Sequence, residues 1–327
     1  MRIIAAILAM FMLLALPACN NMPAASGDKL VAYASVYPMY DFLREIGGEH
    51  VDARSIMPAG VEPHDWEPST QDIINLENAE LFVYNGAGLE HWVDRVVSTL
   101  KNQTLVVVNT SEKVRLLVED EDGHEHHEDE ETHDDHDHEH HENDHDHHNH
   151  HDHDGVDPHI WLSIDNARAQ TAAISEALIM LDPDNADYYT ERLEAYHAEL
   201  IAIDTEYRTA LADVPRRSIV VAHKAYGYLC YSYDLEQVSV LGFSPDSGDP
   251  APPAMVEVEK FCRENDVKVI FFEGSDPRIA NAIASAVGAT TDILTPIESL
   301  TQEDIENGEN YLSLMRRNLA ALVRALS

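Results

Sequence analysis

The sequence predicts an α/β protein of two domains, each with a mainly parallel four-stranded sheet, joined by one long linking helix. Short β-branched and aromatic runs alternate with amphipathic helical segments, which is typical of βαβ units and parallel sheets. The alternation occurs twice, once on each side of a long helical segment. A chain of 327 residues is long enough to bury two sizeable cores.

The elements before the long helix are expected to form an N-terminal domain over residues 29–181. Gly47 and Gly48 provide a C-cap for its first helix, and Ser69 provides an N-cap for its second. The strands are expected over residues 29–35, 51–57, 80–84 and 104–108. The helices are expected over residues 39–46, 70–78, 89–100 and 165–180.

The linking helix is expected over residues 182–214. Asp182 is a suitable N-cap, Pro183 suits the first helical position, and Pro215 follows the end. Apolar and aromatic residues recur along this segment at three- and four-residue spacing, so one face is buried. A C-terminal domain is expected over residues 215–327. Its strands are expected over residues 218–222, 236–241, 268–272 and 290–294. Its helices are expected over residues 223–231, 255–265, 277–287 and 309–326.

The N-terminus has the features of a targeting segment. Arg2 precedes an apolar run over residues 3–16, which is too short to be a good membrane span. The run ends in Leu16-Pro17-Ala18-Cys19, which resembles a bacterial lipobox, so we expect a signal peptide over residues 1–18 and lipidation of Cys19. An ordinary signal peptide with an incidental cysteine is the alternative. Residues 19–28 are expected to tether a soluble remainder outside the cytoplasmic membrane, on the periplasmic side or the cell surface.

An insert rich in histidine and acidic residues occupies residues 119–157. It has nineteen acidic residues and no Lys or Arg, and it cannot bury enough apolar surface to fold, so we expect a disordered loop. Imidazole and carboxylate groups bind divalent metals, so we favour metal capture over a solvated charge run without a role. The expected accessory metal loop contains His124, His126, His127, His133, His136, His138, His140, His141, His145, His147, His148, His150, His151 and His153.

The charge of the chain argues against a nucleic-acid partner. The formal net charge is −39, and without the insert it falls to −20, so the remainder is still strongly acidic. Beyond Cys19, the chain contains Cys230 and Cys262. They are expected either to pair, as is possible outside the cytoplasm, or to be small buried apolar residues, and neither alternative makes them catalytic.

Three of the six histidines outside the insert are candidate metal ligands. His64 follows a strand in a turn-rich segment, His159 precedes a helix, and His223 ends a strand. Ligands bind open α/β sheets outside the carboxyl ends of the strands, and three neutral imidazoles with one oxygen form a tetrahedral zinc site. The remaining histidines, at positions 50, 91 and 197, are expected to be exposed or satisfied by local partners.

Several motifs resemble the zinc-specific solute-binding lipoproteins of ABC transporters, the ZnuA/AdcA type within the cluster A-I metal-binding family. The matching stretches are residues 62–68 (EPHDWEP), 157–162 (DPHIWL), 222–229 (AHKAYGYL) and 294–300 (LTPIESL), with 271–273 and 311–318 also similar. The resemblance implies that His64, His159 and His223 bind the metal. The fourth ligand would be Glu298, with Asp292 or water as alternatives.

The resemblance implies a carrier and not an enzyme. Zn²⁺ would be captured between the domains as a transported ligand and delivered to an ABC permease by a lipid-anchored monomer. Manganese proteins of this group replace the third histidine by a carboxylate, so His223 favours zinc over manganese or another divalent metal. Affinity is expected to fall as the pH drops through about 6.5. The competing functions are a surface adhesin or metal buffer, and a zinc enzyme with Glu62 or Glu273 as base.

Overall fold

The computed structural model describes residues 29–119, 125–126, 155–242, 252–273 and 277–327. The expected signal peptide, the tether with Cys19, and most of the expected accessory metal loop lie outside these residues. Of the fourteen insert histidines, His126 is within a described element, the two-residue strand β6 (Glu125–His126) that pairs with β5 (Val118–Glu119). The other thirteen lie outside the described residues.

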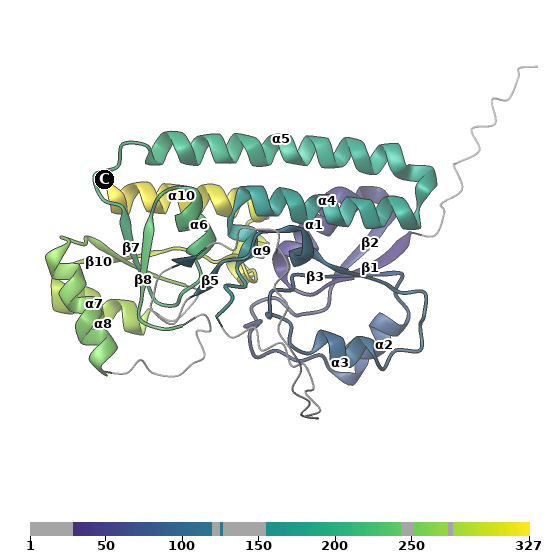
Figure 1. Cartoon of the computed structure of the whole chain (residues 1–327), viewed down its shortest axis with the longest axis horizontal. Helices are drawn as coiled ribbons and strands as arrows, with labels where there is room; N and C mark the ends of the chain where they lie inside the picture. Colours follow the sequence, from purple (N-terminus) through teal and green to yellow (C-terminus); the bar gives the residue numbers. More distant parts are fainter. Residues whose placement is uncertain (1–28, 120–124, 127–154, 243–251, 274–276) are drawn as a thin grey trace, which may run out of the picture.

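The N-terminal half contains a sheet of four parallel strands in the order β2-β1-β3-β4. The strands are β1 (Leu30–Ala34), β2 (Val51–Ser55), β3 (Leu81–Tyr84) and β4 (Val106–Asn109). Its helices are α1 (Tyr37–Gly47), α2 (Thr70–Glu77), α3 (Val93–Val97) and α4 (Ile164–Leu181). Helices α1 and α4 lie on one side of this sheet and α2 and α3 on the other (Figure 1). Side chains alternate along β1, so Ala32 faces the first pair and Tyr33 the second.

The C-terminal half contains a second sheet of four parallel strands, in the order β10-β9-β7-β8. The strands are β7 (Ser218–Val221), β8 (Glu236–Ser239), β9 (Val269–Phe272) and β10 (Thr290–Ile293). The helices of this half are α6 (Gly227–Ser232), α7 (Pro252–Glu264), α8 (Arg278–Val287), α9 (Gln302–Glu306) and α10 (Tyr311–Leu326). Helices α7 and α8 pack on one face of the sheet through a cluster that includes Val258, Ile270 and Ile283.

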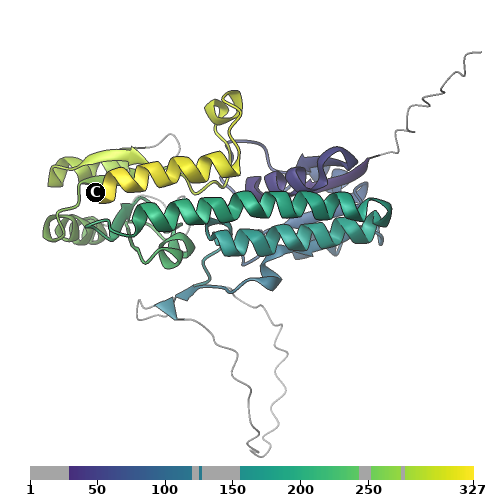
Figure 2. The same cartoon turned by 90° about the horizontal axis from the view of Figure 1, so that it is seen from above.

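One helix, α5 (Ala186–Leu211), extends along the N-terminal half and onto the C-terminal half and lies against both (Figures 1 and 2). Its 26 residues give a rod of about 39 Å. Its buried side chains recur at helical spacing, and they are Tyr189, Tyr196, Leu200, Ile203, Tyr207 and Leu211. The helix contacts α1 and α4 of the N-terminal half and α10 of the C-terminal half. The predicted fold class, two parallel α/β sheets joined by a long helix, is therefore confirmed.

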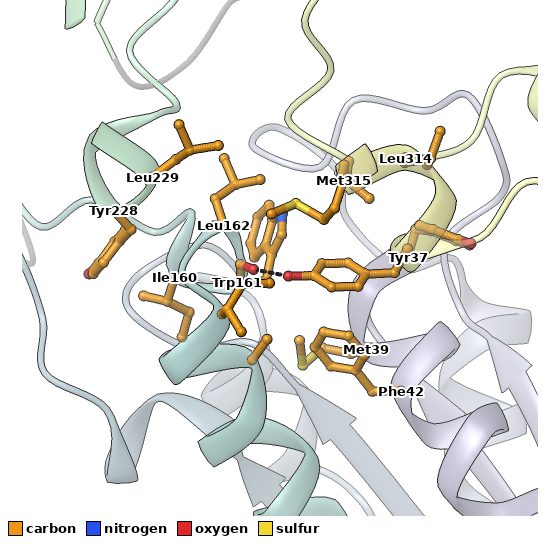
Figure 3. Close-up of a cluster of buried hydrophobic side chains, with 14 of the residues drawn as sticks. Tyr37, Met39, Phe42, Ile160, Trp161, Leu162, Tyr228, Leu229, Leu314 and Met315 are labelled. Atoms are coloured by element: carbon orange, nitrogen blue, oxygen red, sulfur yellow. Dashed lines mark hydrogen bonds between the residues drawn. The ribbon is translucent and has the colours of Figure 1, made fainter. Parts of the chain in front are cut away.

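A single apolar cluster continues across the junction between the halves. Figure 3 shows side chains of α1, α6 and α10 meeting the segment that precedes α4, with Phe42, Trp161, Leu229 and Met315 among them. The centre of this junction is the short 3₁₀ helix η3 (Ile160–Leu162), whose three residues are fully buried. The two sheets are therefore held in one packed body and not only by the linking helix.

Three expected elements differ from those observed, and one observed helix was not expected. The expected helix over 182–214 is a 3₁₀ turn, η4 (Pro183–Asn185), followed by α5, because Asp182 closes α4 before the chain turns back. The expected helix over 89–100 is reduced to α3, since the chain first completes a turn with positive φ at Gly86, Ala87 and Gly88. Helix α6 begins at Gly227 and not at residue 223. Helix α9 was not predicted.

The two remaining cysteines are both buried, and they are not joined in a disulfide. Cys230 packs in the cluster at the junction and Cys262 in the cluster under α7 and α8, so the structure agrees with the interpretation of two small apolar residues and contradicts a disulfide. Within the described ranges, no helix has both the length and the apolar character needed to cross a bilayer.

Candidate metal centre

The carboxyl ends of strands from both sheets deliver the candidate ligands to one place. His64 lies in the loop that follows β2, His223 is two residues beyond the end of β7, and Glu298 follows β10. His159 is the residue before η3, which leads into α4. Ligand sites of open α/β sheets lie at this edge because the chain leaves the strands there in loops that can carry polar groups.

The four side chains converge on one carboxylate oxygen. Oε1 of Glu298 lies 2.7 Å from Nε2 of His159 and 3.3 Å from Nε2 of His64. It lies 3.8 Å from Nε2 of His223. One candidate ligand atom from each of the four residues lies within 4.8 Å of the others. This arrangement has the size and composition of a four-ligand metal site.

Burial and unpaired nitrogen atoms make the group suitable for a cation. His159 and His223 are fully buried, Glu298 is 5 % exposed, and the side chain of His64 is 10 % exposed. Among the described residues, Nε2 of His223 has no hydrogen-bond partner. A buried polar nitrogen without a hydrogen-bond partner is unfavourable, and a metal ion bound in its place would remove this cost. Three imidazoles and one carboxylate match the donor types and number of tetrahedral zinc sites.

Asp157 holds the ring of His159 from the side away from Glu298. Its Oδ1 lies 2.8 Å from Nδ1 of His159 and also accepts a 2.9 Å hydrogen bond from the backbone N–H of the same residue. Burial alone lowers the pKa of His159, but the hydrogen bonds with Asp157 and Glu298 outweigh it and raise that pKa to about 9. With Nδ1 engaged, Nε2 is the nitrogen presented to the centre.

Glu273 occupies the equivalent place beside His223. Its Oε2 lies against Nδ1 of His223, and its Oε1 accepts a 3.2 Å hydrogen bond from the hydroxyl of Tyr226. Burial lowers the pKa of His223, but the negative charges of Glu273 and Glu298 beside the ring outweigh it and raise that pKa to about 10. Burial raises the pKa of the Glu298 carboxyl, but contacts with three histidines outweigh it and hold that pKa well below its usual range.

The alternative residues lie elsewhere or have other partners. Asp292, the other candidate for the fourth ligand, points to the guanidinium of Arg324, with oxygen–nitrogen distances of 2.7 and 3.0 Å. Oε1 of Glu62 accepts a 3.2 Å hydrogen bond from the backbone N–H of His64 and lies 3.9 Å from Nε2 of that residue. Both candidate bases of a zinc enzyme are therefore in contact with a candidate ligand.

The three other histidines have local partners, as expected. His197 Nε2 lies 3.0 Å from the hydroxyl of Thr171, His91 lies beside Glu67 on the surface, and His50 packs edge-on against the ring of Tyr188. Sequence reasoning missed the orienting roles of Asp157 and Glu273. The first had a signal, since an acidic residue two positions before a ligand histidine is within reach of its ring. Glu273 was singled out only as part of a matching stretch and as a candidate base, and its pairing with His223 had no signal because the two residues are fifty positions apart in the chain.

Comparison with known proteins places the whole chain in one group. The family described as "Zinc-uptake complex component A periplasmic", ZnuA, matches residues 32–325. The chain is 36% identical over 326 residues to the high-affinity zinc uptake system protein ZnuA of Bacillus subtilis, covering 98% of this chain and 96% of that protein. It is 32% identical to the zinc-binding lipoprotein AdcA of Streptococcus pneumoniae, over 98% of this chain but only 60% of AdcA.

A solved structure agrees with this assignment. The Zn(II)-bound ZnuA-like domain of Streptococcus pneumoniae AdcA superimposes with a TM-score of 0.73 at 28% sequence identity, covering 91% of this chain and 99% of that domain. Similarity of sequence and of fold thus extends over both halves and the linking helix. The chain belongs to the ZnuA family of zinc-uptake solute-binding proteins.

Proposed function

We propose that this chain binds one Zn²⁺ through His64, His159, His223 and Glu298 and carries it as cargo. The observation that supports this most directly is the convergence of three Nε2 atoms on one carboxylate oxygen in a buried position. Two of these ligands come from each half, so the bound ion would link the halves. Zinc is preferred over manganese because three imidazoles and a single carboxylate are softer than the oxygen-rich sites that manganese favours.

Delivery to an ABC permease is the second part of the proposal. It is supported by the family to which the chain belongs and by the zinc-uptake system named for the relative in Bacillus subtilis. The protein would act as a monomer outside the cytoplasmic membrane, held there by a lipid on Cys19. The histidine-rich insert would raise the local concentration of zinc near the centre and bind further ions weakly.

Calorimetric titration with Zn²⁺ tests the site against the insert. We would compare the full chain with a variant in which residues 120–154 are replaced by a short Gly-Ser linker, which leaves the pairing of Val118 with Val156 in place. We expect one tight site in both proteins and additional weak sites only in the full chain. Loss of tight binding in the linker variant would refute the proposal and favour a metal buffer or adhesin built on the insert.

A histidine substitution tests the ligand set. His223→Ala in the linker variant is expected to weaken zinc binding by several orders of magnitude, whereas His91→Ala serves as a matched control on the surface. Unchanged affinity in His223→Ala would remove this residue from the site. Ester and peptide hydrolysis by the zinc-loaded protein tests the enzyme alternative, and we expect no turnover above that of the metal-free protein.

A further inference from the structure

We propose that the hydroxyl of Tyr228 is a positioning group for the metal centre, acting from the C-terminal half on a ligand of the N-terminal half. It fixes Asp157, and Asp157 in turn fixes the ring of His159. The inference rests on the proposed function, since it concerns how tightly a bound ion is retained. Tyr228 lies on α6, is 2 % exposed, and belongs to the apolar cluster shown in Figure 3, where α6 contacts η3.

The Tyr228 hydroxyl bridges the two chain segments between which the insert lies, and we call this point the base of the insert. It accepts a 3.0 Å hydrogen bond from the backbone N–H of Leu117 and donates one of 3.0 Å to the carbonyl oxygen of Asp157. The same two residues are joined directly, because the N–H of Asp157 donates a 3.0 Å bond to the carbonyl of Leu117. The adjacent bridge between Val118 and Val156 continues this pairing. One side chain of the C-terminal half therefore holds both strands that flank the insert.

The Asp157 side chain is confined by the residue next to Tyr228. A Cβ atom at Gly227 would lie 2.4 Å from Oδ2 of Asp157 and 3.2 Å from Nε2 of Gln237, so only glycine leaves room for this carboxylate. The requirement is for space, because Gly227 is not among the glycines with positive φ. Gln237 is itself fixed, since its Oε1 accepts a 2.9 Å hydrogen bond from the N–H of Tyr226. The carboxylate that orients His159 is thus seated against Gly227 at the start of α6.

The orientation of His159 consequently depends on contact between the halves. His159 belongs to the N-terminal half. The position of Asp157, which orients the His159 ring, is set by Tyr228 and Gly227 of the C-terminal half. A displacement of α6 relative to η3 would move Asp157, and the ring of His159 would lose its alignment with Glu298. Retention of the ion would therefore be coupled to the docking of the halves, which provides a route to release when a partner separates them.

Two substitutions in the full chain test this role, each with a matched control. Tyr228→Phe removes the hydroxyl and keeps the ring, and Gly227→Ala pushes on Asp157 while every polar group remains. Tyr207→Phe is the control for the first. Tyr207 lies on α5, and the substitution removes a buried hydroxyl that donates a 2.7 Å hydrogen bond to the carbonyl of Met315. Gly242→Ala is the control for the second, because a Cβ there would have no neighbour within 4 Å.

The measurements are the rate of zinc release to a strong chelator and the visible absorption spectrum of the Co²⁺-loaded protein, which reports ligand geometry. We expect Tyr228→Phe and Gly227→Ala to release zinc roughly tenfold faster or more, and to change the Co²⁺ spectrum. Both controls should match the wild type in these two measurements, even where Tyr207→Phe unfolds at a lower temperature. A merely structural role for Tyr228 would lower stability and leave the spectrum unchanged.

The outcomes separate this inference from the proposed function. Wild-type release rates and spectra in both Tyr228→Phe and Gly227→Ala would overturn the positioning role and leave zinc binding intact. If Tyr228→Phe does not fold, Gly227→Ala decides alone, since it adds one methyl group at a helical position and removes no hydrogen bond. Failure of the wild-type chain to bind zinc at one equivalent would overturn the proposed function and this inference with it.

Discussion

The indole Nε1 of Trp161 donates a 2.7 Å hydrogen bond to the carbonyl oxygen of Pro296. Trp161 lies two residues after His159, and Pro296 lies two residues before Glu298, so this bond joins the two ligand-bearing segments across the junction. The donor and its ring are fully buried. We therefore expect this contact to contribute both to folding and to the spacing of the metal ligands.

Substitution of Trp161 by Phe should affect stability and metal binding together. It leaves a buried carbonyl oxygen without a donor, which costs about 1–3 kcal/mol, and the smaller ring adds a packing defect. Denaturant unfolding of the metal-free protein and zinc release measure the two effects. Trp92→Phe is the control, since Trp92 is equally buried but packs under the first sheet, and it should alter stability only.

Zinc binding should release protons at neutral pH. The pKa values of about 9 for His159 and about 10 for His223 mean that both rings are in the positively charged, doubly protonated form at pH 7 in the metal-free protein. Zinc must displace one proton from each ring that it binds. Calorimetry at pH 7 in buffers with different ionisation enthalpies should detect at least one proton released per zinc. A binding enthalpy that does not depend on the buffer would contradict this expectation.

The same pKa values set the direction of the pH dependence. Raised values stabilise the folded metal-free protein below about pH 6.5, and this contribution is lost as the pH rises through 9 and 10. Zinc affinity should change in the opposite sense and increase from pH 6.5 to about 9. The decline that the sequence predicts below pH 6.5 is therefore expected to begin at a higher pH.

The fourth ligand can be tested on two acidic residues that are close in sequence. Glu298→Gln should retain zinc through the three histidines but with lower affinity, because the charge of the carboxylate is lost. Asp292→Asn removes only a partly exposed pair with Arg324 and should leave affinity unchanged. Competition with a chromogenic chelator measures both variants. An equal loss in the two would refute the assignment of Glu298.

Zinc should raise the thermal stability of the protein with the logarithm of its free concentration, once that concentration exceeds the dissociation constant. An ion that binds only the folded state adds about 2.7 kcal/mol at one hundred times its dissociation constant. Calorimetric scans with zinc, with manganese and with a chelator measure the shift. We expect zinc to raise the midpoint clearly more than manganese does, and the reverse order would contradict zinc preference.

Periodicity and capping residues predicted most of the fold. The eight strands of the two sheets were all expected within a few residues, and Ser69 caps α2 through a reciprocal bond with Asp72. Errors occurred where tertiary contacts override local preference. His223 was expected to start a helix, but residues 223–226 form a loop that directs the His223 ring into the centre. Helix α9 had a signal in Thr301 and Asp304, which form a capping box.

The sequence indicated the four candidate ligands that the structure brings together, but not the residues that support them. His64, His159 and His223 are identifiable because each lies in a motif at the expected edge of a strand or helix. The contacts of Glu273 with His223, of Trp161 with Pro296 and of Tyr228 with Asp157 join residues far apart in the chain. No periodicity or spacing reports such pairs, since they depend on how the two sheets dock.

The closed base of the insert has a consequence for how this protein can vary. The Leu117–Asp157 pairing brings the two ends of the insert together, so the segment between them begins and ends at nearly the same point. The entropic cost of closing a loop grows only slowly with its length. We therefore expect that the histidine-rich segment can be exchanged as a unit. Its length and histidine content can be changed, in nature or by design, without rebuilding the centre beside it.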